Sequence, residues 1–161
     1  MDNYQINHPE IEIGASFKSI NHINNLAEVV NELESAGIKY FHLDFFDGSM
    51  VKEKGLSADD AIKIRNLTKL PIEAHLMMYQ PHEMGYYRDL GVNRVLIQHE
   101  SYGDKEKMLL DAKNKGMGSG IALKPSAPHD DKEIIYPEIS DQILVMATRC
   151  GSMGRVYDES A

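Results

Sequence analysis

The sequence predicts an α/β fold in which a parallel sheet is built from repeated strand–helix units. Short apolar segments rich in β-branched residues alternate with segments of helical periodicity along the whole chain. No Gly-x-Gly-x-x-Gly string follows the first expected strand, which disfavours an open dinucleotide-binding sheet. Polar residues instead recur where several strands end, as is typical of β/α barrels. We therefore expect a partial (β/α)8 barrel of about six strands, forming a single, incomplete barrel domain over residues 1–161.

The expected strands are short apolar runs bounded by glycine, proline or polar residues. Because a helical segment separates each strand from the next, the strands should pair in parallel through right-handed crossovers. They are, in chain order, residues 11–16, 40–44, 71–77, 92–98, 118–124 and 143–148.

Five helices are expected between these strands, and most have a start or stop signal. The helix over 21–36 has apolar residues at helical spacing and Gly37 in the position of a C′ glycine. Ser57 begins a capping-box pattern for the second helix. Pro81 suits the first turn of the third helix, which should end at Gly91. The later helices are expected over residues 104–115 and 130–136.

Composition and charge exclude several classes of partner. The chain has a formal net charge of −8 and no basic cluster, so it lacks the positive stripe that non-specific nucleic-acid binding needs. No apolar run approaches the length of a membrane span, and residues 1–10 lack the apolar core of a secretory signal. Cys150 is the only cysteine, which favours a reducing compartment. We therefore expect a cytoplasmic protein.

Two short strings at the ends of the second and third expected strands carry the chemistry. Because side chains alternate along a strand, His42 and Asp44 share one face of theirs, and Glu73 and His75 share a face of the next. Two histidines and a carboxylate at neighbouring strand ends are suitable ligands for a divalent metal ion. The alternative is a set of strand-end polar residues that are held only by hydrogen bonds. The occurrence of both strings in order, each after a helix, favours the metal site.

These strings resemble the ribulose-phosphate 3-epimerase family, whose fold is a phosphate-binding (β/α)8 barrel. Residues 42–48 match the family's His-x-Asp-x-Met-Asp-Gly string, and residues 74–77 match part of Asp-x-His-Leu-Met-Val. Weaker matches are residues 14–16 and 120–125, and the resemblance extends over about residues 13–157.

The resemblance implies roles for the matching residues. His42, Asp44 and His75 would bind a divalent metal ion (zinc, iron, manganese or cobalt). Asp44 would also be the acid/base that moves the proton at C3 of a ketose phosphate, through an ene-diolate. The loop after the sixth strand would hold the phosphate through backbone amides. The residues expected to bind substrate are Ser16, His75, Met77, Gly151, Ser152, Met153 and Gly154.

The expected activity is therefore that of an isomerase of carbohydrate metabolism, a metal-dependent 3-epimerase in the pentose phosphate pathway. Ribulose 5-phosphate and xylulose 5-phosphate are the expected substrate pair, and allulose 6-phosphate is the alternative substrate. A different class is also open, namely a non-catalytic barrel remnant that binds a sugar phosphate or a partner protein.

Several positions depart from the family pattern. Met153 stands where the phosphate loop usually has a glycine, and Arg155 could offset that change with a charged donor. The family's second catalytic aspartate and fourth metal ligand lie on a seventh strand, beyond the six expected here. We therefore expect these 161 residues to epimerise inefficiently. The open edges of a six-stranded barrel also favour a homo-oligomer.

Three further polar residues near the strand ends have open or structural interpretations. Asp47 precedes a glycine and should be a turn carboxylate that faces away from Asp44. Glu73 could orient His75 or a neighbouring group, or form a buried ion pair. His99 could line the site or be a hydrogen-bonded structural histidine.

Overall fold

Six strands form one parallel sheet in the structure, a computed structural model that describes residues 11–125, 136–148, 150 and 151. The sheet order follows the chain order, and every neighbouring pair is parallel, as successive β/α units require. All six expected strands are present. That residues 1–161 form a single domain stays a prediction. The strands are β1 (Gly14–Phe17), β2 (Tyr40–Phe45), β3 (Ile72–Leu76), β4 (Arg94–Gln98), β5 (Gly118–Leu123) and β6 (Gln142–Val145).

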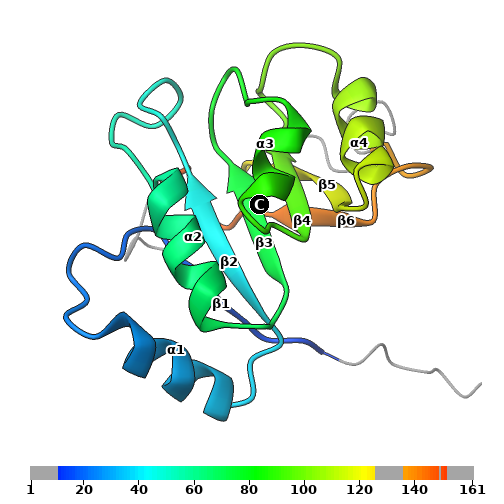
Figure 1. Cartoon of the computed structure of the whole chain (residues 1–161). Coiled ribbons are helices and arrows are strands. Elements are labelled where there is room, and N and C mark those ends of the chain that lie inside the picture. The colour runs from blue at the N-terminus through cyan, green and yellow to red at the C-terminus, as the bar shows by residue number, and fades with distance from the viewer. Residues whose placement is uncertain (1–10, 126–135, 149, 152–161) are drawn as a thin grey trace, which may run out of the picture.

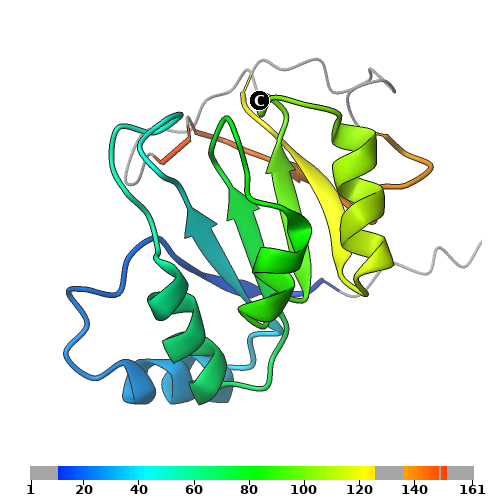
Figure 2. The same ribbon diagram turned by 45° about the horizontal axis from the view of Figure 1, so that its top comes forward.

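The helices of the described ranges cover one face of the sheet (Figures 1 and 2). The sheet curls, so that the helix-covered face is convex and the first and last strands lie behind the central ones (Figure 2). Each described helix is too short or too polar to cross a membrane. The helices are α1 (Leu26–Ser35), α2 (Ala58–Leu67), α3 (Met84–Asp89) and α4 (Lys105–Asn114).

The hydrophobic core lies between the convex face of the sheet and the helices. In β2, burial alternates from residue to residue: Phe41, Leu43 and Phe45 belong to the core, whereas His42 and Asp44 point to the opposite, inner face. This period-2 pattern is the reason that an apolar strand can present polar groups on one side without breaking its packing on the other.

Capping residues fix where the first two helices begin. Ser57 and Asp60 form the expected capping box, because each side chain bonds the other residue's backbone N–H. The expected start of the first helix at residue 21 is wrong, since α1 begins at Leu26. The side chain of Asn25 accepts a hydrogen bond from the backbone of Glu28 and so ends the preceding loop there.

The expected position of Pro81 in the first turn of the third helix is also wrong. α3 begins at Met84, and Pro81 lies in the loop that precedes it. In that loop the backbone N–H of His82 donates to the hydroxyl of Tyr87 at 3.3 Å, a tertiary contact that sequence signals do not reveal. The expected fifth helix, over 130–136, falls almost wholly outside the described residues.

The two edge strands of the sheet approach each other at their carboxyl ends. β1 and β6 lie at opposite ends of the strand order. Nevertheless, the Nζ of Lys18, directly after β1, donates to the backbone oxygen of Gly151, after β6, at 2.8 Å. The curl of the sheet therefore brings the loops after the first and last strands together around one opening.

Candidate metal centre and active site

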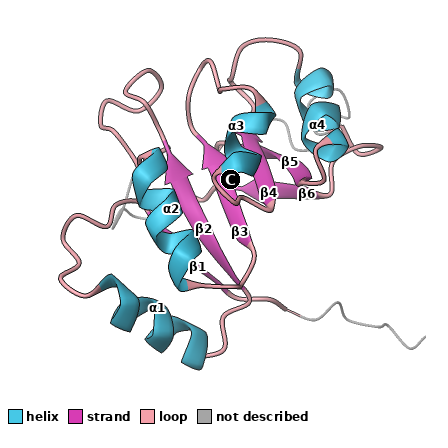
Figure 3. Cartoon of the chain, in the orientation of Figure 1, coloured by secondary structure: helices cyan, strands magenta, loops and turns pink. Residues whose placement is uncertain are grey.

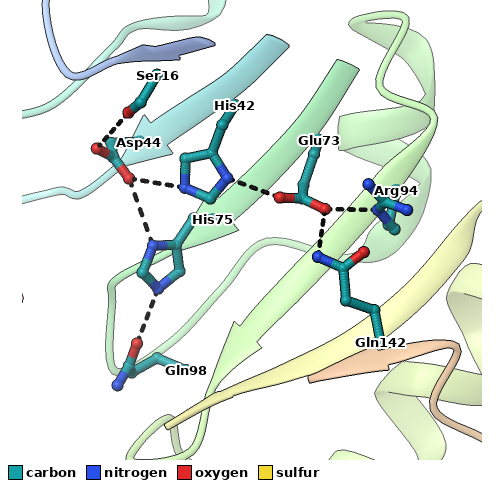
Figure 4. A network of polar contacts seen from close by, with 8 residues as sticks. All are labelled: Ser16, His42, Asp44, Glu73, His75, Arg94, Gln98 and Gln142. Carbon is teal, nitrogen blue, oxygen red and sulfur yellow. Dashed lines mark hydrogen bonds and ion pairs between the residues drawn. The ribbon is translucent and has the colours of Figure 1, made fainter. Parts of the chain in front are cut away.

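β2 and β3 are neighbouring strands of the sheet (Figure 3), and their polar side chains gather on its inner face (Figure 4). The parallel register places His42 beside Glu73 and Asp44 beside His75. Because residues paired in this way point to the same side of a sheet, all four side chains face one another rather than the core. Alternation along each strand, which the sequence predicts, puts these side chains on one face, and the pairing register of β2 with β3 puts them next to one another.

His42, Asp44 and His75 converge on one point. Oδ1 of Asp44 lies 3.3 Å from Nε2 of His42 and 3.3 Å from Nδ1 of His75. One ligand atom from each residue lies within 4.8 Å of the other two. Two imidazole nitrogens and a carboxylate oxygen are a donor set that suits divalent transition metals. The arrangement fits the ion that was expected at these residues.

The other nitrogen of each histidine ring is anchored by a separate partner. Nδ1 of His42 lies 2.7 Å from Oε1 of Glu73, and Nε2 of His75 lies 2.8 Å from Oε1 of Gln98. The amide of Gln98 is oriented in turn, because its nitrogen donates to Glu100 at 2.9 Å. Since both ring partners are acceptors, the anchored nitrogens carry protons, and the other nitrogen of each ring is left to interact with Asp44 or to bind a metal ion.

Glu73 connects the site to two further strands. It is 1% exposed, and its Oε2 accepts from Nε of Arg94 at 2.5 Å and from Nε2 of Gln142 at 2.8 Å (Figure 4). Burial opposes ionisation, but hydrogen bonding to His42 and the charge of Arg94 hold the pKa of Glu73 below its usual value. Glu73 therefore both orients a histidine and forms a buried ion pair; the ring it contacts is that of His42.

Electrostatics favour an ionised carboxylate at the centre of the site. Burial raises the pKa of Asp44, but hydrogen bonds from His42 and His75 outweigh it and hold the pKa well below its usual value. Burial lowers the pKa of His42, whereas hydrogen bonds to Asp44 and Glu73 raise it, with a net rise to about 9. A protonated His42 and an ionised Asp44 therefore balance each other, and a divalent ion would bind in competition with the proton of His42.

A cavity of about 280 Å³ opens beside these three side chains at the carboxyl end of the strands. Met77, expected to bind substrate, lines it and is 1% exposed. Ser16, also expected to bind substrate, is not among the lining residues, but its Oγ lies 3.4 Å from Oδ2 of Asp44. Gly151 lines the cavity as expected, whereas the expected phosphate-loop residues 152–154 lie outside the described residues. The cavity is lined by Lys18, His42, Asp44, His75, Met77, Leu144, Val145, Met146, Ala147, Thr148 and Gly151.

Two neighbouring polar residues stand apart from the cavity. Asp47 is exposed and its Oδ1 accepts from the backbone N–H of Ser49 at 2.9 Å, as a turn carboxylate does. His99 is not among the lining residues, and its buried Nδ1 finds no hydrogen-bond partner in the described part of the chain. His99 therefore does not line this cavity, and its Nδ1 does not form the hydrogen bond expected of a structural histidine.

Sequence patterns missed Lys18, Arg94, Gln98 and Gln142. Arg94 and Gln98 are the first and last residues of a strand whose middle is apolar, and these polar ends are the only feature of the strand's sequence that could have indicated a functional role. Lys18 directly follows Ser16-Phe17, but its contact with Gly151 depends on the curl of the sheet.

A family model described as "Ribulose-phosphate 3 epimerase family" matches residues 12–161. The chain belongs to this family. Among curated relatives, ribulose-phosphate 3-epimerase of Methanocaldococcus jannaschii is 29% identical over 153 residues, covering 91% of this chain and 62% of the relative. The enzyme of the same name from Synechocystis sp. is 27% identical, with 83% and 59% covered. The chloroplastic ribulose-5-phosphate-3-epimerase of Arabidopsis thaliana is 26% identical, with 94% and 54% covered.

The chain therefore spans between 54% and 62% of the length of these three relatives. Among solved structures, a crystal structure of monomers of phosphoribosylanthranilate isomerase from Thermotoga maritima matches with a TM-score of 0.58 and 17% identity. The match covers 84% of this chain and 64% of that one. At this identity the likeness concerns the fold alone. Together with the curled parallel sheet, it confirms the expected partial (β/α)8 barrel.

Proposed function

We propose that this chain acts on a ketose phosphate as a metal-dependent 3-epimerase, with ribulose 5-phosphate and xylulose 5-phosphate as the substrate pair. The observation that carries the proposal is the convergence of Nε2 of His42, Oδ1 of Asp44 and Nδ1 of His75 beside a cavity, in a member of this family. The cytoplasmic location and the homo-oligomeric state stay predictions.

His42, Asp44 and His75 are the residues that would hold the divalent ion, with zinc, iron, manganese and cobalt all compatible with nitrogen and carboxylate ligands. When bound, such an ion supplies positive charge that stabilises the negative charge developing on the substrate oxygens. The anchoring of both rings supports this role, because ring nitrogens held by a carboxylate or an amide keep the ligand atoms in place.

The two oxygens of Asp44 have different surroundings, which supports a division of labour between them. Oδ1 faces both histidines, whereas Oδ2 faces the hydroxyl of Ser16 at 3.4 Å. In our proposal Oδ2 takes the C3 proton of the substrate, and the C–H electron pair passes into the ene-diolate. The same oxygen can return that proton to the same face of C3.

Inversion at C3 also needs a proton donor on the opposite face. Among the described residues that line the cavity, Asp44 is the only carboxylate. The family resemblance assigns the second acid to a seventh strand. We therefore expect the 161-residue polypeptide, expressed as it stands, to exchange the C3 proton with solvent faster than it inverts that carbon. Loss of one positioned acid/base lowers the rate of inversion by about 10²–10⁴-fold.

The test is incubation of the metal-loaded chain with ribulose 5-phosphate in heavy water, followed by NMR. We expect deuterium at C3 with little xylulose 5-phosphate. Asp44→Asn should reduce exchange by about 10²-fold or more, whereas Asp89→Asn, on the exposed end of α3, should leave it unchanged. Exchange that survives Asp44→Asn, or the absence of exchange in the metal-loaded parent, would contradict the proposal.

A further inference from the structure

Lys18 occupies an unusual position at the mouth of the cavity. It directly follows β1, and its side chain is only 19% exposed. Its Nζ donates to Oε2 of Glu53 at 2.8 Å and to the backbone oxygen of Gly151 at 2.8 Å. The ring of Phe46 lies below it, with its centroid 5.6 Å from Nζ. The loops after β1, β2 and β6 therefore meet at this ammonium group.

The distribution of charged residues around the cavity makes this ammonium group a candidate for binding an anion. Among the described lining residues, Lys18 is the only lysine or arginine, and Asp44 is the only carboxylate. The whole chain carries a net charge of −8, so its long-range field repels anions. A phosphorylated substrate must therefore meet a local cation or a set of local donors to remain bound.

The present partners of Lys18 leave room for an anion. An ammonium group has three donor hydrogens, and the contacts with Glu53 and Gly151 use two of them. Glu53 has a side chain that is 69% exposed, and ion pairs that involve such exposed groups are weak. A phosphate dianion can therefore displace the Glu53 carboxylate from Lys18 at little cost in free energy.

We propose that Lys18 is the residue that binds the phosphate end of the substrate and so selects phosphorylated over free ketoses. Glu53 competes with that phosphate for the ammonium group of Lys18. This inference rests on the proposed function, since it places the substrate in the same cavity. Lys18 adjoins Gly151 in the loop after β6, so the anion would lie between Gly151 and the end of β1.

A purely structural role for Lys18 makes different predictions. In that case the side chain only pins the loop after β6 to β1, and anions have no effect on it. Gly151 also lies close to Val51, since a Cβ added to this glycine would lie 2.5 Å from Cγ1. The hydrogen bond from Lys18 is therefore not the only contact of Gly151 with the rest of the molecule.

The first experiment uses inorganic phosphate as the probe and metal-free protein, so that binding to an ion does not contribute. Calorimetry should show that Lys18→Met weakens phosphate binding about tenfold or more, since a charge-assisted hydrogen bond is lost. Lys18→Arg should restore most of the affinity. Glu53→Gln should tighten binding several-fold, because the competing charge is removed.

The matched control is Lys113→Met. Lys113 also pairs with an exposed carboxylate at 2.8 Å, that of Asp141, but this pair lies before β6, at the opposite end of the sheet. Lys113→Met should bind phosphate like the parent. If Lys18→Met binds phosphate as tightly as the parent and changes only the melting temperature, Lys18 is a structural pin and the proposal is wrong.

The second experiment separates this inference from the proposed function. In the metal-loaded chain, Lys18→Met should raise the ribulose 5-phosphate concentration needed for half-maximal C3 exchange by about tenfold, with most of the exchange rate at saturation retained. It should also reduce the preference over unphosphorylated ribulose. Phosphate binding that depends on Lys18, without any C3 exchange in the parent, would overturn the epimerase proposal and leave the anion site intact. C3 exchange with an unchanged preference in Lys18→Met would do the reverse.

Discussion

The two faces of β2 and β3 differ in what surrounds their side chains. On the convex face, Leu43 and Ile72 are at most 1% exposed and belong to the hydrophobic core. On the inner face, His42 and Glu73 occupy adjacent positions of the same strands and contact polar groups. Because successive residues alternate between the faces, stability and ligand binding depend on neighbouring residues in one strand. Substitutions one residue apart can therefore separate the two properties.

The largest effect should come from the pair Leu43→Ala and His42→Ala. Leu43→Ala leaves a cavity in the core and should lower the free energy of unfolding by about 2–5 kcal/mol. Metal binding should be retained wherever this variant is folded. His42→Ala should instead lower zinc affinity by more than about 100-fold, since a ligand matters more than the groups behind it. Urea denaturation and competitive chelator titration measure the two quantities.

Two results would contradict this separation of stability from metal binding. Reduced metal affinity in folded Leu43→Ala protein would mean that the core also determines the positions of the ligands. Unchanged zinc affinity in His42→Ala would remove this residue from the metal site.

A smaller effect is expected from the carboxylate behind His42. Glu73→Gln should lower metal affinity by about 10–100-fold, because the ring loses the charged partner that fixes Nδ1–H. Glu100→Gln is the matched variant on the His75 side, and it should have a weaker effect, since Glu100 lies one hydrogen bond further from the ring. Chelator titration of both proteins gives the order. Equal affinities in Glu73→Gln and the parent would show that Glu73 has only a structural role.

The smallest effect should come from the helix cap on the convex side. Ser57→Ala should lower the free energy of unfolding by about 1 kcal/mol at pH 7 and leave metal affinity unchanged. Burial raises the pKa of Asp60, but hydrogen bonds from Ser57 outweigh it and lower the pKa. The stabilisation from this pair is therefore present above the unfolded pKa of about 3.9 and is lost as the pH falls through the folded pKa. Urea titrations at pH 7 and at a pH below the folded pKa of Asp60 should show that the difference in unfolding free energy between variant and parent is smaller in acid.

Local patterns in the sequence were sufficient for the features that depend on a few adjacent residues. The capping box at Ser57 and the shared face of His42 and Asp44 follow from spacing alone, and both are present. The side chains of the candidate metal site also meet as expected, because parallel strands place their carboxyl ends at the same edge.

Features that depend on register and curvature were not predictable in this way. Arg94 and Gln142 reach Glu73 from strands that follow it by 21 and 69 residues. Lys18 meets Gly151 across 133 residues, only because the sheet curls. The roles of all three residues depend on long-range contacts that single-sequence patterns do not encode.

The two histidines of the site present opposite ring nitrogens to Asp44: Nε2 in His42 and Nδ1 in His75. The short arm of an asparagine amide reaches about as far as Nδ1, and the longer arm of glutamine reaches about as far as Nε2. During evolutionary drift, His75 should therefore give way to asparagine more readily than to glutamine, and His42 should show the opposite preference. Residues of the same type in one site would thus follow different substitution paths, set by the nitrogen that each holds toward the centre.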